Sequence, residues 1–77
     1  MEDMGSLKPG EQGVIRQIAG EDAMSRRLLE LGFCPGARVC CRGRSPAGDP
    51  LAFGICGATV AIRRRDCRRV LLEDAHE

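Results

Sequence analysis

Apolar residues alternate with other residues in five short segments of the chain, which is the period typical of β-strands. The alternation is clearest at Leu51, Phe53 and Ile55, and it recurs at Val60 and Ile62. Together the five segments predict strands near residues 12–18, 37–43, 51–55, 59–63 and 69–73.

One further segment has a helical period. Met24, Leu28 and Leu31 recur at i, i+4 and i+7, so they share one face of a helix over about residues 22–31. Asp22 suits the position before the first helical residue, because its carboxylate accepts hydrogen bonds from unpaired N–H groups of the first turn. The sequence therefore predicts a single helix, placed between the first and second strands.

The end of this helix is well specified. Gly32 suits the left-handed conformation just past a helix, and Phe33 is then expected to fold back onto Leu28. Pro35 cannot continue a helix, since it has no N–H to donate. Pro35 and Gly36 together favour a tight turn, because proline presets φ at the first corner and glycine accepts positive φ at the second. We expect Gly32, Pro35 and Gly36 to be structural residues.

These elements predict a mainly β fold. A chain of 77 residues has room for one thin core, and residues 44–50, rich in proline and glycine, favour a hairpin loop. Closing a five-stranded sheet would hide its edges. We therefore expect a single domain over residues 1–77, a small five-stranded barrel with one helix inserted after the first strand. Its core would cover about residues 6–73, with frayed termini.

Composition narrows the class of protein. With 30% charged and 43% hydrophobic residues, the chain is typical of a globular domain. The longest uncharged run, between Asp49 and Arg63, is too short to cross a bilayer, so no direct membrane insertion is expected. A secretory signal begins with basic residues, whereas this chain has the acidic residues Glu2 and Asp3 at its start. We expect a cytoplasmic protein.

Basic residues are concentrated near the end of the chain. Residues 63–69 hold five of the twelve basic residues, which raises the question of nucleic acid. With no Trp, no Tyr and two Phe, the chain has almost no rings on which bases could stack, so no nucleic acid is expected. An acidic protein partner is the better candidate, against the alternative of a merely solvated face. The candidate partner-binding residues are Arg63, Arg64, Arg65, Arg68 and Arg69, followed by Met24 and Leu28 on the helix.

Five cysteines raise the question of metal. Their odd number argues against a disulfide framework, and no Cys-x-x-Cys pair is present. Cys40 and Cys41 are neighbours on a strand and therefore point to opposite faces. We expect Cys41 and Cys67 to be buried as small hydrophobic residues. Cys34 and Cys56 are expected to be exposed, where they could act as adventitious ligands.

Other chemistry has little support. The single histidine, His76, lies with Asp74 and Glu77 in an acidic tail, where a loosely held metal is a weaker interpretation than solvated side chains. No serine or cysteine is paired with this histidine, and no phosphate-binding glycine pattern occurs. We expect no catalytic residues, no cofactor and no intrinsic metal site. Weak transition-metal binding stays open, but folding would not require it.

Four segments in this order resemble the FeoA family of ferrous-iron transport accessory proteins: SLKPGEQGVIRQI, RRLLELGFCPGARV, GDP and GATVAIRRRDCRRVLLE. The resemblance covers about residues 6–73. Its most specific part is the leucine-rich helix that ends in Leu-Gly and is closely followed by Pro-Gly. A later pattern of Gly57, Ala61 and Arg63 is correctly placed, and it makes Gly57 a further structural residue. The resemblance implies an SH3-type barrel.

The resemblance also implies a function. FeoA proteins are thought to act beside FeoB, a ferrous-iron permease of the membrane with a cytoplasmic GTPase domain. The chain would then be a non-enzymatic accessory protein that binds and modulates this partner at the inner face of the membrane. The alternative is a stand-alone regulatory or metal-sensing SH3-like module, as in the C-terminal domains of iron-dependent repressors. Weak self-association stays open.

Overall fold

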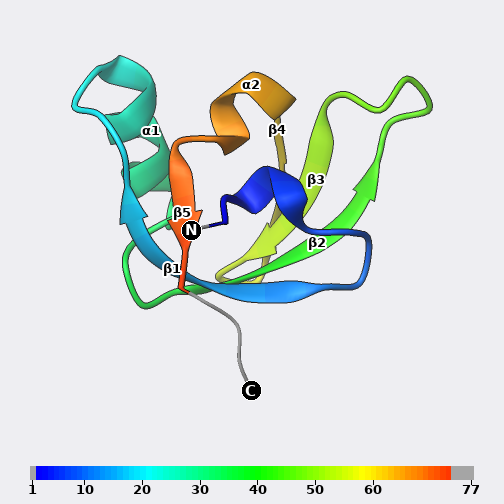
Figure 1. The fold of residues 1–77 in the computed structure, drawn as a ribbon, viewed down its shortest axis with the longest axis horizontal. Coiled ribbons are helices and arrows are strands. Elements are labelled where there is room, and N and C mark those ends of the chain that lie inside the picture. The colour runs from blue at the N-terminus through cyan, green and yellow to red at the C-terminus, as the bar shows by residue number, and fades with distance from the viewer. Residues whose placement is uncertain (1, 74–77) are drawn as a thin grey trace.

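The computed structural model describes residues 2–73 and contains five antiparallel strands in one curved sheet (Figure 1). The helix α1 (Ala23–Leu31) follows the first strand. The predicted mainly β fold with one inserted helix is confirmed, and every strand boundary lies within one residue of its prediction. The strands are β1 (Gln12–Ile18), β2 (Arg38–Arg44), β3 (Leu51–Ile55), β4 (Ala58–Ile62) and β5 (Val70–Leu72), and their order in the sheet is β4-β3-β2-β1-β5.

The expected closure into a barrel is only partial. Within the described part of the chain, β4 pairs with β3 and β5 pairs with β1, and no ladder joins β4 to β5. The segment between the fourth and fifth predicted strands is a short helix, α2 (Arg64–Cys67), which carries the chain from β4 to β5 (Figure 1). The two outer strands are therefore connected by a helical turn and not by hydrogen bonds of a sheet.

The N-terminal segment belongs to the fold, which corrects the expectation that it frays before residue 6. A 3₁₀ helix, η1 (Met4–Ser6), begins after Asp3, whose carboxylate accepts a hydrogen bond of 2.8 Å from Gly5 N. Met4 is fully buried in the core. Leu72 N of β5 donates to Glu2 O at 2.8 Å, so the segment is anchored by backbone as well as by burial.

Both ends of α1 have the predicted geometry. Asp22 is the N-cap, and its Oδ1 accepts a hydrogen bond of 3.2 Å from Ser25 N. Gly32 has φ 109°, in the left-handed region. Phe33 N donates to Leu28 O at 3.0 Å, and both side chains are fully buried. The predicted stop of the helix is confirmed.

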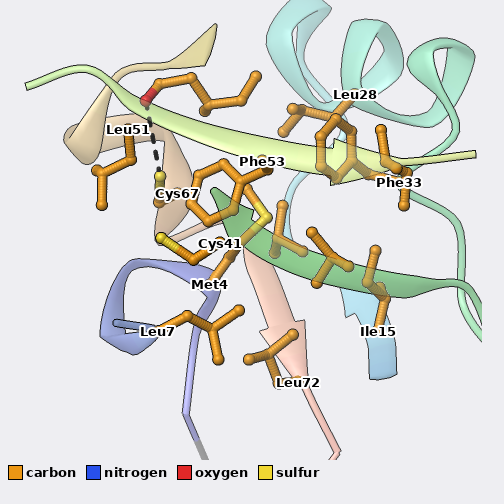
Figure 2. Packing of buried hydrophobic residues seen from close by; sticks show 14 residues of the cluster. Met4, Leu7, Ile15, Leu28, Phe33, Cys41, Leu51, Phe53, Cys67 and Leu72 are labelled. Carbon is orange, nitrogen blue, oxygen red and sulfur yellow. Dashed lines mark hydrogen bonds between the residues drawn. The ribbon is translucent and has the colours of Figure 1, made fainter. Parts of the chain in front are cut away.

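The core lies between the inner face of the sheet and the helices (Figure 2). Cys41 and Cys67 are fully buried among its apolar side chains, which confirms that they act as small hydrophobic residues. Cys40, on the opposite face of β2, is only half-buried. The largest fully buried side chains are Phe33, Phe53, Met4, Ile15, Leu28 and Leu51.

Candidate partner-binding site

A groove of about 250 Å³ lies between α1 and the segment from β4 to α2. Met24 and Leu31 line it from the helix, and Val60 and Ile62 line it from β4. Met24 and Val60 are half-buried, and 36% of Leu31 is exposed. An apolar surface that stays partly open to solvent is typical of the centre of a protein interface.

The position of Leu28 corrects one sequence-based candidate. Leu28 and Ser25, which lie one turn apart, face the core and are fully or almost fully buried. Met24 and Leu31 flank this contact and therefore reach the groove. Leu28 is thus a core residue with no surface to offer a partner. Leu31 takes its place as a candidate. It belongs to the same apolar stripe of the sequence, but periodicity does not show which members of a stripe are buried and which are partly exposed.

The charged residues of the groove come from α1 and from α2 with its N-cap residue. Arg27 of α1, the N-cap residue Arg63 and Arg65 of α2 line it together with Asp66 of α2. The three arginine side chains are exposed, whereas Asp66 is 8% exposed. The two orientations lie within the single turn of α2, because Asp66 and Cys67 are buried while the preceding arginines are exposed. The groove therefore combines an apolar floor with a basic rim.

Arg69 differs from the other arginines of the cluster. Its Nη1 forms an ion pair of 2.7 Å with Asp22 Oδ1 and donates to Ser25 Oγ at 3.2 Å. Its Nε lies 3.6 Å from Asp66 Oδ1. Hydrogen bonds from Ser25, and then the charge of Arg69, lower the pKa of the Asp22 carboxyl below its ordinary value. Arg69, which directly precedes β5, therefore ties that end of the strand to the start of α1, an internal contact that the sequence did not reveal.

Arg64 is exposed, but it also contacts the loop between β2 and β3. Its Nη2 donates to Gly48 O at 3.1 Å, and its backbone N donates to Asp49 Oδ1 at 2.9 Å. Arg68 is exposed as well, as expected for a residue that precedes inward-facing Val70. Arg63, Arg65 and Arg68 are thus the members of the cluster with no such contact among the described residues.

A model of the FeoA domain matches residues 3–74. The chain belongs to the FeoA domain family. A Porphyromonas gingivalis protein, described as a fusion of Fe(2+) transport protein A with the Fe(2+) transporter FeoB, is 30% identical over 70 residues. These residues make up 91% of the present chain and 8% of the fusion protein, so the chain spans only a small part of that relative.

Solved FeoA structures have the same fold. The Stenotrophomonas maltophilia FeoA, described as an SH3 domain protein complexed with zinc, is 27% identical with a TM-score of 0.85, and the match covers 95% of this chain and 91% of that one. The Chlorobium tepidum FeoA is 28% identical with a TM-score of 0.85, over 92% of this chain and 68% of that one. The expected SH3-like architecture is therefore confirmed. In the described residues of this FeoA domain, no helix has the length and apolarity that a membrane span requires.

The cysteines of this FeoA domain are all free thiols. Cys34 and Cys56 are exposed, as predicted. Burial raises the pKa of the Cys67 thiol to about 12, so this sulfur stays protonated and is a poor metal ligand. Residues 2–73 contain no group of three or more His, Cys, Asp and Glu side chains placed to hold a metal ion. The tail residues Asp74, His76 and Glu77 lie outside the described residues.

Proposed function

We propose that this FeoA domain is a non-enzymatic accessory module of ferrous-iron uptake that binds and modulates a FeoB-type permease. The observation that carries the proposal is the Porphyromonas gingivalis relative, in which the two parts are described as one fusion protein. Fusion raises the effective concentration of one module near the other, which is useful when the two bind. Binding of this kind would recruit the present domain to the cytoplasmic face of the membrane.

The groove supports a protein partner. Its floor of Met24, Leu31 and Val60 offers apolar contact area, and its basic rim would attract an acidic surface. We infer that the partner presents an apolar side chain flanked by acidic residues. Such an interface would weaken with salt, because exposed charges are screened over about 8 Å at physiological ionic strength.

Reversal of two rim charges tests this assignment. Arg63→Glu with Arg65→Glu should weaken binding to the permease's cytoplasmic portion by tenfold or more and should reduce its salt dependence. The matched control is Arg26→Glu with Arg44→Glu, since both residues are exposed and neither lines the groove. Calorimetric titration at low and moderate salt measures both effects, with a melt of each variant. Equal affinities for the two double variants would exclude the groove.

A metal-sensing regulatory module is the second candidate. Manganese-dependent transcriptional repressors share the fold, with a TM-score of 0.82 at 19% identity in one case, over 94% of this chain and 35% of that one. The exposed thiols of Cys34 and Cys56 would be its available soft ligands. Thermal stabilisation by Fe²⁺ or Zn²⁺ that is lost in Cys34→Ser would favour this function over the accessory role.

A further inference from the structure

The outer face of the sheet carries arginines that the groove does not use. Arg16 of β1 and Arg38 and Arg42 of β2 are exposed, and each is preceded or followed by an inward-facing residue, so they point away from the core. Val14, which neighbours Arg16 on this face, pairs with Arg38 in the ladder. These three residues, the outer-face arginines, therefore lie on one side of two adjacent strands.

Acidic residues flank the strands but do not lie within them: Glu11 precedes β1, and Glu73, whose N donates to Val14 O at 2.8 Å, follows β5. None of the five strands, β1 to β5, contains an Asp or a Glu. Within residues 2–73, the recorded ion pairs of the domain are both made by Arg69, so none involves the outer-face arginines. The face is thus a basic surface with unused hydrogen-bond donors, and it is distinct from the groove rim.

The absence of a side chain at Gly54 leaves room for the Arg42 guanidinium on this face. A Cβ built on Gly54 of β3 would lie 2.5 Å from Arg42 Nε and 3.0 Å from its Cζ. The guanidinium therefore lies against the backbone of Gly54, where any larger residue would displace it. Arg42 and Arg38 line a shallow depression of about 300 Å³ together with Gln12 and Cys40. The arrangement presents guanidinium donors for the oxygens of an anion.

We propose that the outer-face arginines bind the phosphate groups of an anionic membrane surface. Three observations favour this occupant over a macromolecule of another class. The face has no exposed apolar anchor, which protein interfaces normally contain at their centre. Both phenylalanines are fully buried, so no ring is available to stack on a base. β2 lies between β1 and β3, so an acidic strand has no free edge to pair with there.

The expected strength follows from the number of charges. Each arginine near an anionic bilayer contributes about 1 kcal/mol, or about fivefold in partitioning, so three give about a hundredfold. At physiological ionic strength that is too weak to hold the domain on its own, but it would orient a domain that a partner already keeps at the membrane, and at low salt, where charges are screened less, it is strong enough to detect. Binding of the outer-face arginines to an anionic surface does not require the permease, so the purified chain is sufficient for the test.

The experiment uses the purified chain and two kinds of vesicle, one of phosphatidylcholine and one of equal parts phosphatidylglycerol and phosphatidylcholine. Co-sedimentation at low salt should show binding to the anionic vesicles alone. The triple variant Arg16→Gln, Arg38→Gln, Arg42→Gln should lose about a hundredfold in partitioning. A control with the same net charge, Arg26→Gln, Arg44→Gln, Arg68→Gln, should lose less than tenfold. Circular dichroism checks that both variants fold.

Three results would overturn the inference. The first is equal binding of the wild-type chain to both kinds of vesicle, and the second is an equal loss in the two triple variants. The third is absence of vesicle binding while polyglutamate, single-stranded DNA or inorganic phosphate binds through the same arginines. That outcome would assign the face to another class of anion.

Discussion

The N-terminal end of α1 is held by three polar side chains, of which only Ser25 is buried, whereas its C-terminal end is held by backbone conformation and by burial of an apolar side chain. At the first end, Asp22, Ser25 and Arg69 form hydrogen bonds and an ion pair. At the second end, Gly32 takes a left-handed conformation and Phe33 is fully buried beneath the helix. Both ends position the wall of the groove that Met24 and Leu31 provide.

Substitutions at the two ends should therefore differ in how much they destabilise the domain. The side chains of Asp22 and Arg69 are 54% and 30% exposed, and exposed ion pairs contribute little because water and salt screen them. The left-handed position of Gly32 is different, because a β-branched residue is strained there whatever surrounds it and solvent does not reduce that strain. We expect changes at the C-terminal end to affect stability strongly and changes at the N-terminal end to affect it weakly.

The largest effect is predicted for Gly32→Val. Its φ of 109° would strain valine, and a Cβ at this position would lie 3.1 Å from Cys56 Sγ. A non-glycine residue held in this region costs about 1–3 kcal/mol, and the crowding adds to it. Chemical denaturation of wild type and variant measures the change in the free energy of unfolding. An unchanged midpoint would show that the C-terminal end is not held by its backbone conformation.

Gly36→Val separates strain from crowding. Gly36 also has a positive φ, of 90°, but nothing lies within 4 Å of a Cβ built on it. We expect this variant to lose less stability than Gly32→Val, because it has backbone strain alone. Equal losses would mean that contact with Cys56 contributes nothing.

The same contrast explains how much the sequence could predict. Strand boundaries, the N-cap at Asp22 and the stop at Gly32 are local features, determined by periodicity and by neighbouring residues, and each was predicted correctly. Met4 was missed because a single buried residue before a turn has no period. The helix α2 was missed because its four residues are too few to show a helical period.

The candidate site depends on contacts between distant residues, which the sequence does not order. Five arginines within seven positions look alike in the sequence, yet Arg69 bonds to Asp22, which lies 47 positions away. Leu28 and Leu31 belong to one stripe, but only packing shows that the first is buried and the second is partly exposed. The sequence could therefore predict that an arginine cluster and an apolar stripe exist. It could not predict which of their residues lie in the core, which make internal contacts and which line the open groove.

A smaller effect is predicted for Asp22→Asn, and it should depend on pH. The folded pKa of the Asp22 carboxyl lies below its ordinary value, chiefly because Ser25 donates hydrogen bonds to it. The contribution of the charge is therefore complete above the ordinary value of about 3.9 and is lost as the pH falls through the folded pKa. The variant should melt slightly below wild type at neutral pH, and the difference should shrink in acid.

Glu30→Gln is the control for this titration. Glu30 is an exposed carboxylate on the same helix, and no hydrogen bond or ion pair of its side chain is found among residues 2–73. Its melting temperature should follow that of the wild type at every pH. A difference between wild type and Asp22→Asn that persists at low pH would mean that the network is held by geometry and not by charge.

The smallest effect is predicted for treatment with a metal chelator. This treatment tests whether a metal ion stabilises the C-terminal end of α1 in addition to Gly32. Cys34 and Cys56 are exposed thiols near this end, and the Stenotrophomonas maltophilia FeoA is described as complexed with zinc. Two thiols without further ligands fall short of a structural zinc site, which takes four. Treatment with EDTA should therefore leave the unfolding midpoint of the present chain unchanged, as should Cys34→Ser with Cys56→Ser. If the chelator lowered the midpoint of the wild type but not of the double variant, the end of α1 would be held by metal as well as by Gly32, and the contrast between the two ends would be weaker than we argue.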